Sequence, residues 1–175
     1  ATGLGNVAHT HFELFMEAMG INYSRLKKKG LAIKKKWDKA KIIRVKTDLG
    51  TDVTFDVTDM QAVANVGEYH KSGQGGNMPA GEVYIPPKGM DGVNGKVMID
   101  GSMKTQSGAV LLSEPLTLFI EKGRIVKIEG AQAALLEETF RKFENRAKYP
   151  HRIRHIAELG VGINPSALLI GSMIM

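Results

Sequence analysis

The chain has 175 residues, a mass of 19.1 kDa, a formal net charge of +6 and 43% hydrophobic residues. This size and apolar content suit one compact domain and exclude an extended disordered chain. The chain has no cysteine, which excludes disulfides and thiolate metal ligands, and it has no apolar run long enough to span a bilayer. We therefore expect a cytoplasmic protein without a membrane partner.

The first part of the chain, residues 1–40, is predicted to be helical. A first helix is expected over residues 7–19, where large apolar side chains recur at helical spacing: Phe12, Phe15, Met16 and Met19. A second helix is expected from Ser24, its predicted N-cap, to about Lys36. Gly30 is predicted to be a weak point of this helix, because glycine has low helix propensity.

The positive charge is concentrated in residues 25–46, which hold 11 basic residues and one acid. Such a stretch could contact nucleic acid or an anionic surface. It also carries Leu26, Leu31, Ile33 and Trp37 at helical spacing, which favours a helix with a solvated lysine face. We therefore expect no nucleic-acid partner. The alternative, a non-enzymatic basic domain that binds nucleic acid, predicts strongly salt-dependent binding.

Residues 41–130 are predicted to be rich in strands. A hairpin is expected from strands over 41–46 and 51–57, and a second from strands over 116–121 and 124–129 around Lys122-Gly123. Shorter strands are expected over 83–85 and 95–100. The last part, residues 131–175, is predicted to contain a helix over 131–145 and a short segment that begins at Pro150. This order of elements predicts an α+β fold with a mixed, largely antiparallel sheet and flanking helices.

Both ends of the chain are unusual. It begins without methionine, and it ends in an apolar stretch, residues 167–175, with no polar tail. Unpaired, such a stretch would be an aggregation-prone edge. We expect the chain to be part of a longer polypeptide and of a larger catalytic domain; the alternative is a natural C-terminal strand packed into the core.

Two glutamates, Glu82 and Glu158, stand among apolar residues and glycines. Glu82 follows Gly81, and Glu158 precedes Gly160 and Gly162. Carboxylates in apolar surroundings need a positive partner, and their oxygens suit divalent metals. Both residues are therefore candidate metal ligands. The simpler alternatives are a surface acid at a strand edge for Glu82 and a helix-end acid before a turn for Glu158.

Other constellations in the sequence predict no particular chemistry. The glycine-rich residues 72–76 lack the lysine and the Ser/Thr of a phosphate-binding P-loop. The five histidines form no His-Glu-x-x-His pair, and no nucleophile-base arrangement can be argued. No catalytic or substrate-binding residue is therefore assigned.

Four sequence blocks carry a resemblance to a known family. They are residues 2–10 (TGLGNVAHT), 50–52 (GTD), 77–84 (NMPAGEVY) and 158–164 (ELGVGIN). In this order they resemble the thermophilic metallo-aminopeptidases, the family of aminopeptidases T and S. The resemblance implies a two-metal site in which Glu82 and Glu158 are ligands, with zinc, cobalt, manganese and magnesium not distinguishable. It also implies a peptide substrate, metal-activated water and a tendency toward homodimers.

The family's remaining ligands, a histidine in Gly-Thr-x-His and a later His-x-Asp pair, follow the Glu158 block, and this chain ends at Met175 before them. The resemblance therefore implies a fragment of a leucyl-aminopeptidase-like hydrolase that is inactive as the isolated chain. A second enzyme hypothesis is an iron-dependent, ring-cleaving dioxygenase acting on a dihydroxypyridine, since such enzymes resemble this family in their C-terminal half.

Overall fold

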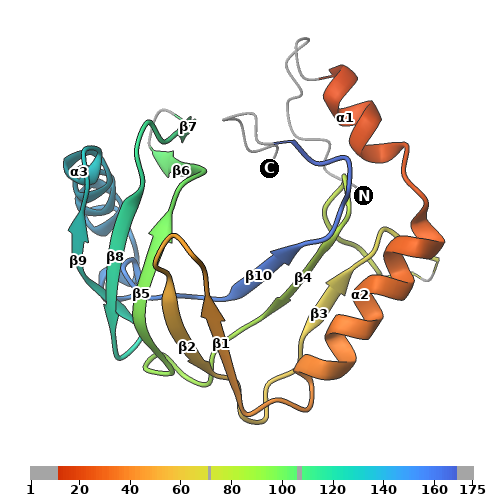
Figure 1. Ribbon diagram of the computed structural model, residues 1–175, viewed down its shortest axis with the longest axis horizontal. Coiled ribbons are helices and arrows are strands. Elements are labelled where there is room, and N and C mark those ends of the chain that lie inside the picture. The colour runs from red at the N-terminus through yellow and green to blue at the C-terminus, as the bar shows by residue number, and fades with distance from the viewer. Residues whose placement is uncertain (1–11, 71, 106–107, 169–175) are drawn as a thin grey trace.

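Antiparallel sheets flanked by helices make up the computed structural model, which describes residues 12–70, 72–105 and 108–168 (Figure 1). This arrangement confirms the predicted α+β class. The helices are α1 (Phe12–Met19), α2 (Tyr23–Trp37), α3 (Ala133–Glu144) and a 3-10 turn, η2 (Pro150–Arg152). The strands are β1 (Ile42–Lys46), β2 (Asp52–Asp56), β3 (Val63–Asn65), β4 (Glu82–Ile85), β5 (Val93–Ile99), β6 (Ser102–Thr105), β7 (Gly108–Leu111), β8 (Leu116–Glu121), β9 (Arg124–Glu129) and β10 (Leu159–Gly162).

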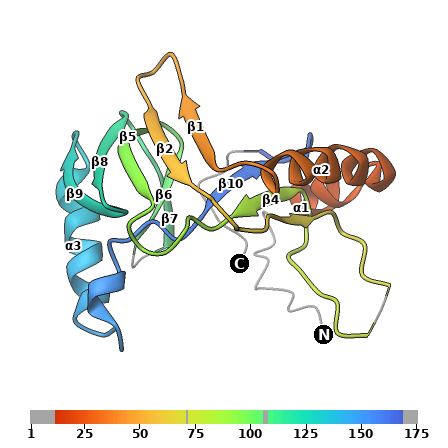
Figure 2. The ribbon, with the colours of Figure 1, turned by 90° about the horizontal axis from the view of Figure 1, so that it is seen from below.

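The larger sheet has the strand order β1-β2-β5-β8-β9, and all its neighbours are antiparallel. A smaller sheet has the order β10-β4-β3, and β6 pairs with β7. Alternating residues of β8 are buried, namely Leu116, Leu118 and Ile120, as expected for a strand with one face on the core. Figure 2 shows α1 and α2 at one end of the molecule and α3 at the other, with the sheets between them.

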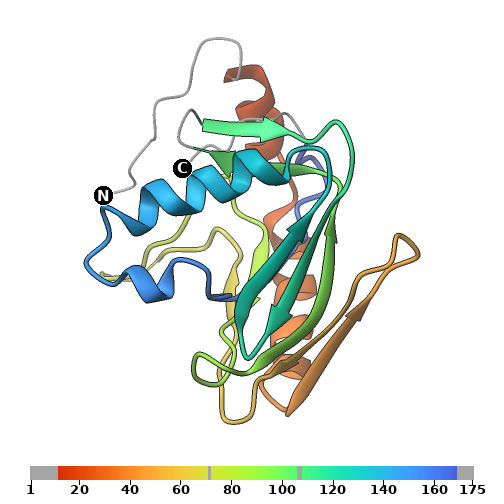
Figure 3. The same cartoon turned by 90° about the vertical axis from the view of Figure 1, so that its left-hand side faces the viewer.

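Both predicted hairpins are confirmed. β1 pairs with β2, and β8 pairs with β9 across Lys122 and Gly123, which both have positive φ. The last predicted helix is also confirmed as α3, which packs against β6 and β9 (Figure 3). These elements form as predicted because their signals are local: alternation, a turn that requires positive φ, and an apolar helical stripe.

The start of the chain differs from the prediction in two ways. Residues 7–11 of the first predicted helix lie outside the described residues, and α1 covers the rest. The cap of α2 is Asn22 rather than Ser24, because the Asn22 backbone is extended and its side chain accepts a hydrogen bond from the Arg25 N–H at 2.9 Å. Ser24 lies within the first turn of the helix.

Gly30 is a packing position of α2, not a weak point. The helix continues through it, and a Cβ placed there would lie 2.8 Å from Cγ1 of Val66 and 3.2 Å from Cδ1 of Ile163. The missing side chain therefore allows α2 to approach the smaller sheet closely, and α2 contacts both β3 and β4. Figure 1 shows α2 on the outer side of this sheet.

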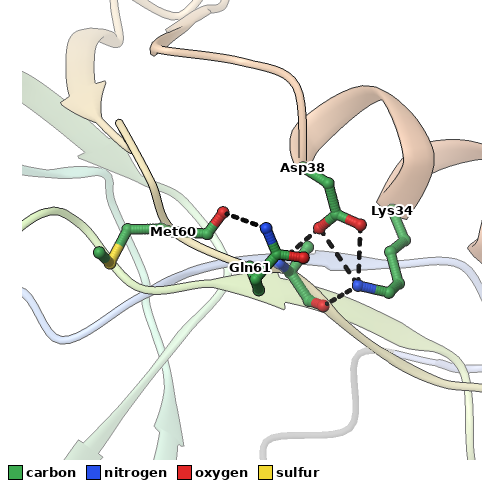
Figure 4. A network of polar contacts seen from close by, with 5 residues as sticks. Lys34, Asp38, Met60 and Gln61 are labelled. Carbon is green, nitrogen blue, oxygen red and sulfur yellow. Dashed lines mark hydrogen bonds and ion pairs between the residues drawn. The ribbon is translucent and has the colours of Figure 1, made fainter.

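A polar network fixes the end of α2 to the segment before β3 (Figure 4). Asp38 accepts a hydrogen bond from the Ala62 N–H at 2.9 Å, and Lys34 donates to Asp38 and, at 2.7 Å, to the Ala62 carbonyl. The hydrogen bond from Lys34 and that from Ala62 lower the pKa of Asp38 below its usual range. The charged form of Asp38 thus stabilises the fold at pH values above the ordinary carboxyl pKa.

Replacing Asp38 with asparagine is expected to lower the free energy of unfolding by about 1 kcal/mol at pH 7, because one charged hydrogen-bond acceptor is lost. Since the folded-state pKa is lowered, the wild-type advantage should shrink as the pH falls through that pKa. Urea denaturation of both proteins between pH 7 and pH 2 measures this. Asp48→Asn, at an exposed turn position between β1 and β2, is the control and should change little. If the difference in the free energy of unfolding between the wild type and Asp38→Asn stayed constant from pH 7 to pH 2, the stabilising role of the charged Asp38 would be contradicted.

None of the helices that the structure describes combines the length and the apolar content needed to cross a membrane.

Candidate metal site

Glu82 is the first residue of β4, and the turn before it fixes its position. Gly81 has a φ of 127°, and a Cβ there would lie 2.5 Å from Cβ of Asn164. Asn164 itself donates hydrogen bonds from its Nδ2 to the carbonyls of Ala18 and Ala80, each at 2.9 Å. The Ile163 N–H also donates to the Gly81 carbonyl at 2.7 Å. The turn is therefore held from both sides at the point where Glu82 leaves it.

Glu158 immediately precedes β10, which pairs antiparallel with β4. Gly162 lies opposite Glu82, and Gly160 lies opposite Tyr84. Directly paired residues project to the same face of a sheet, so these four residues share a face. Glu158 lies one residue before β10, near enough to Glu82 for the charge of Glu82 to raise the pKa of Glu158. The structure thus brings together the two glutamates that the sequence singles out.

The opposite face of β4 belongs to the core. Val83 and Ile85 are both fully buried, and they alternate with Glu82 and Tyr84, which are half-buried. One face of this strand is therefore fixed by apolar packing, while the other presents a carboxylate. This alternation gives Glu82 a rigid support, which a ligand-binding residue needs.

The two carboxylates interact unfavourably with each other. Burial, and then the negative charge of Glu82, raise the pKa of Glu158 above its usual value. Among the described residues, no lysine, arginine or histidine forms an ion pair with either glutamate. Two neighbouring carboxylates without a positive partner are the arrangement that a bound cation stabilises.

A lack of side chain at Gly160 makes room for the Glu82 carboxylate. A Cβ built on Gly160 would lie 2.5 Å from Oε1 of Glu82, whereas a Cβ on Gly162 would meet no described atom within 4 Å. The sequence motif predicts close approach of backbone at these glycines. At Gly160 the group that approaches is instead a side chain from the neighbouring strand.

The structure does not assemble a complete metal site from the part of the chain it describes. There, no group of three or more histidine, cysteine or acidic side chains is placed to hold a metal. His155 contacts the Met90 carbonyl, and His70 lies near Glu68. His9 and His11 lie outside the described residues. The described residues therefore offer a carboxylate pair, Glu82 and Glu158, but no complete ligand set.

Sequence reasoning missed the polar support beside Glu82. Asn65 of β3 lies opposite Glu82, donates a hydrogen bond to the Asn77 carbonyl and accepts one from the Tyr69 hydroxyl. The short strand β3 has only three residues and gives no clear alternation, so the sequence did not predict it. Burial raises the pKa of the Tyr69 hydroxyl, which keeps it a hydrogen-bond donor.

The structure is an α+β fold in which two glutamates, the candidate metal ligands, lie at the smaller sheet. A family model described as NicX, 2,5-dihydroxypyridine 5,6-dioxygenase, matches residues 9–173. Because this match covers nearly the whole chain, the chain belongs to the NicX family. No curated protein matches it.

A solved structure is also similar. The 2,5-dihydroxypyridine dioxygenase from Pseudomonas putida KT2440 matches with a TM-score of 0.73 and 23% sequence identity, over 90% of this chain and 43% of that chain. At this identity the likeness shows the fold alone. The chain spans less than half the length of that structure.

The resemblance to the thermophilic metallo-aminopeptidases is wrong as a family assignment, and the hydrolase and aminopeptidase functions it implied are overturned by the NicX match. The blocks around Glu82 and Glu158 specify a strand pair with glycines opposite a carboxylate, and such a local frame can serve different chemistries. The prediction of a divalent metal is compatible with a dioxygenase family, and the identity of the metal stays a prediction.

Proposed function

We propose that this chain forms part of an iron-dependent dioxygenase that opens the ring of 2,5-dihydroxypyridine or of a close dihydroxypyridine analogue. The observation that carries this proposal is the family match over residues 9–173. The similar fold of the Pseudomonas putida enzyme supports it. Among the hypotheses raised by the sequence, the ring-cleaving dioxygenase thus replaces the aminopeptidase.

In this function Glu82 and Glu158 would hold the metal ion. Carboxylate oxygens can contribute to an iron site, as one carboxylate does in the two-His-one-carboxylate sites of non-haem iron oxygenases. The ion would also offset the burial and the repulsion from Glu82 that raise the pKa of Glu158. We propose one iron ion per site, in place of the two-metal centre of the overturned aminopeptidase hypothesis, with the remaining ligands supplied by residues other than this pair or by solvent. A bound ferrous ion supplies the one-electron chemistry that reactions of dioxygen require.

The residues around the pair would orient the substrate. Tyr84 lies opposite Gly160 and two residues from Glu82 on the same face of the sheet. We therefore propose Tyr84 as the residue that would orient an aromatic substrate beside the carboxylates.

An oxygen-uptake assay tests the proposal. The full protein of which this chain forms part, loaded with Fe2+ without air and then given 2,5-dihydroxypyridine and dioxygen, should consume one O2 per substrate while the ring absorbance disappears. An aminoacyl-p-nitroanilide, the matched probe for an aminopeptidase, should stay intact under the same conditions. Hydrolysis of that probe without ring opening would contradict the proposal.

A further inference from the structure

The narrow space above Gly160 is the feature of the candidate site that neither the family nor the sequence motif explains. β10 carries two glycines, Gly160 and Gly162, on the sheet face that it shares with Glu82. Only one of them is close to a carboxylate. Oε1 of Glu82 would lie 2.5 Å from a Cβ on Gly160, whereas carbon and oxygen atoms in contact normally stay more than 3 Å apart.

The register explains why Glu82 reaches this position. Its direct partner in β10 is Gly162, so its side chain starts beside a residue without a side chain. From there it extends along β10 to Gly160, in the direction of Glu158. A methyl group at position 160 would occupy the place of the carboxylate oxygen. The end of a glutamate side chain is flexible, so the carboxylate would move away and the backbone would keep its place.

We propose that Gly160 is a positioning residue that allows the Glu82 carboxylate to lie beside Glu158 and that thereby sets the affinity of the site for a divalent cation. This inference rests on the proposed function, because it assumes that both glutamates hold the metal. It goes further in assigning the geometry of the pair to a residue that has no side chain and cannot be a ligand. It also explains why the two glycines of β10 are not equivalent.

Gly160→Ala is the direct test, with Gly162→Ala as its matched control on the same strand and the same face. Binding of Mn2+, which replaces air-sensitive Fe2+, to the full protein of which this chain forms part can be followed by the loss of the free-ion signal in electron paramagnetic resonance. We expect Gly160→Ala to weaken Mn2+ binding by about 10- to 100-fold, the usual range for residues that orient metal ligands. Gly162→Ala should bind Mn2+ like the wild type. The thermal unfolding of the metal-free proteins should be similar in all three.

A shorter acid at position 82 shows whether Gly160→Ala weakens Mn2+ binding by displacing the Glu82 carboxylate or by some other change in the protein. The carboxylate of Glu82→Asp ends one methylene earlier and does not reach the space above Gly160. If Gly160 acts through Glu82, adding Gly160→Ala to Glu82→Asp should change the Mn2+ affinity less than about threefold. An equal loss in both backgrounds would overturn the inference, as would a Gly162→Ala loss as large as that of Gly160→Ala.

The outcomes distinguish this inference from the proposed function. Wild-type protein that binds no Mn2+ would overturn the metal site itself, and the role of Gly160 with it. In a second outcome, the wild type and Gly160→Ala bind Mn2+ equally well, whereas Glu82→Gln does not bind it. This result would overturn only the role of Gly160. If Gly160→Ala failed to fold, the backbone would not keep its place when a methyl group is added at position 160. Gly160 would then be a structural residue, and the proposed positioning role would be overturned.

Discussion

Glu82→Gln is expected to lower the affinity for a divalent cation by at least about 100-fold and to abolish ring opening. Glutamine keeps the size of the side chain but removes the negative charge and one strong oxygen donor. The fold should not change, because β4 is held by backbone pairing to β3 and β10 and by the buried residues Val83 and Ile85. Calorimetric titration with Mn2+ measures the affinity, and far-UV circular dichroism checks the fold.

Glu158→Gln should also lose the metal, and it carries an additional signature. Because burial and Glu82 raise the pKa of Glu158, its ionised form destabilises the metal-free protein. The protonated form of Glu158 therefore stabilises the fold. This stabilisation is fully present below the ordinary carboxyl pKa and is lost as the pH rises through the raised pKa. The metal-free Glu158→Gln protein should therefore be more stable than the wild type at pH 7 but not at pH 4.

Glu114→Gln is the control for both substitutions, because Glu114 is an exposed acid in the turn before β8 of the larger sheet. It should leave metal affinity and turnover unchanged. Metal binding and ring opening that persist in Glu82→Gln would remove the carboxylate pair as the metal site, even if the dioxygenase activity were confirmed.

Gly95→Ala is expected to have a large effect on stability. Gly95 lies in β5, which pairs with β2 on one side and β8 on the other, and its φ is 128°. An added Cβ would overlap the Asp52 carbonyl oxygen and lie 2.8 Å from Cα of Val53. Both obstacles are backbone of a neighbouring strand, so no side chain can move aside. We expect a loss of about 3 kcal/mol or more in the free energy of unfolding.

Urea denaturation followed by circular dichroism measures this loss. The matched control is Gly73→Ala, since Gly73 also has a positive φ, of 81°, but a Cβ there would meet no described atom within 4 Å. In the control, the free energy of unfolding should fall only by about 1 kcal/mol, because alanine is strained at a positive φ. Similar midpoints for the two variants would show that the larger sheet tolerates a side chain at Gly95.

The local signals of the sequence predicted the hairpins and α3 correctly, because each depends on residues close together in the chain. Lys122 and Gly123 have the positive φ of a tight hairpin turn, and the strand before them, β8, alternates in burial. The two candidate ligands were also identifiable, since an acid framed by glycines and apolar residues is unusual. Their role as metal ligands stays a prediction.

Other features depend on residues far apart and could not be predicted. The segment Leu159–Gly162 has two glycines and weak strand propensity, and it is a strand because β4 pairs with it. The role of Gly30 depends on Val66 and Ile163, which approach it only in the folded state. The family was also assigned wrongly, since short blocks around two glutamates specify a local frame rather than a reaction.

The sequence by itself determined the class of the fold and the local hairpins, and it singled out two acids as candidate metal ligands. Only the tertiary structure decided that these acids lie near each other, that no described cation pairs with them, and that Gly160 rather than Gly162 makes room for Glu82. The physical reason is that strand register joins residues about 80 positions apart, and a shift of one residue would turn every side chain to the other face.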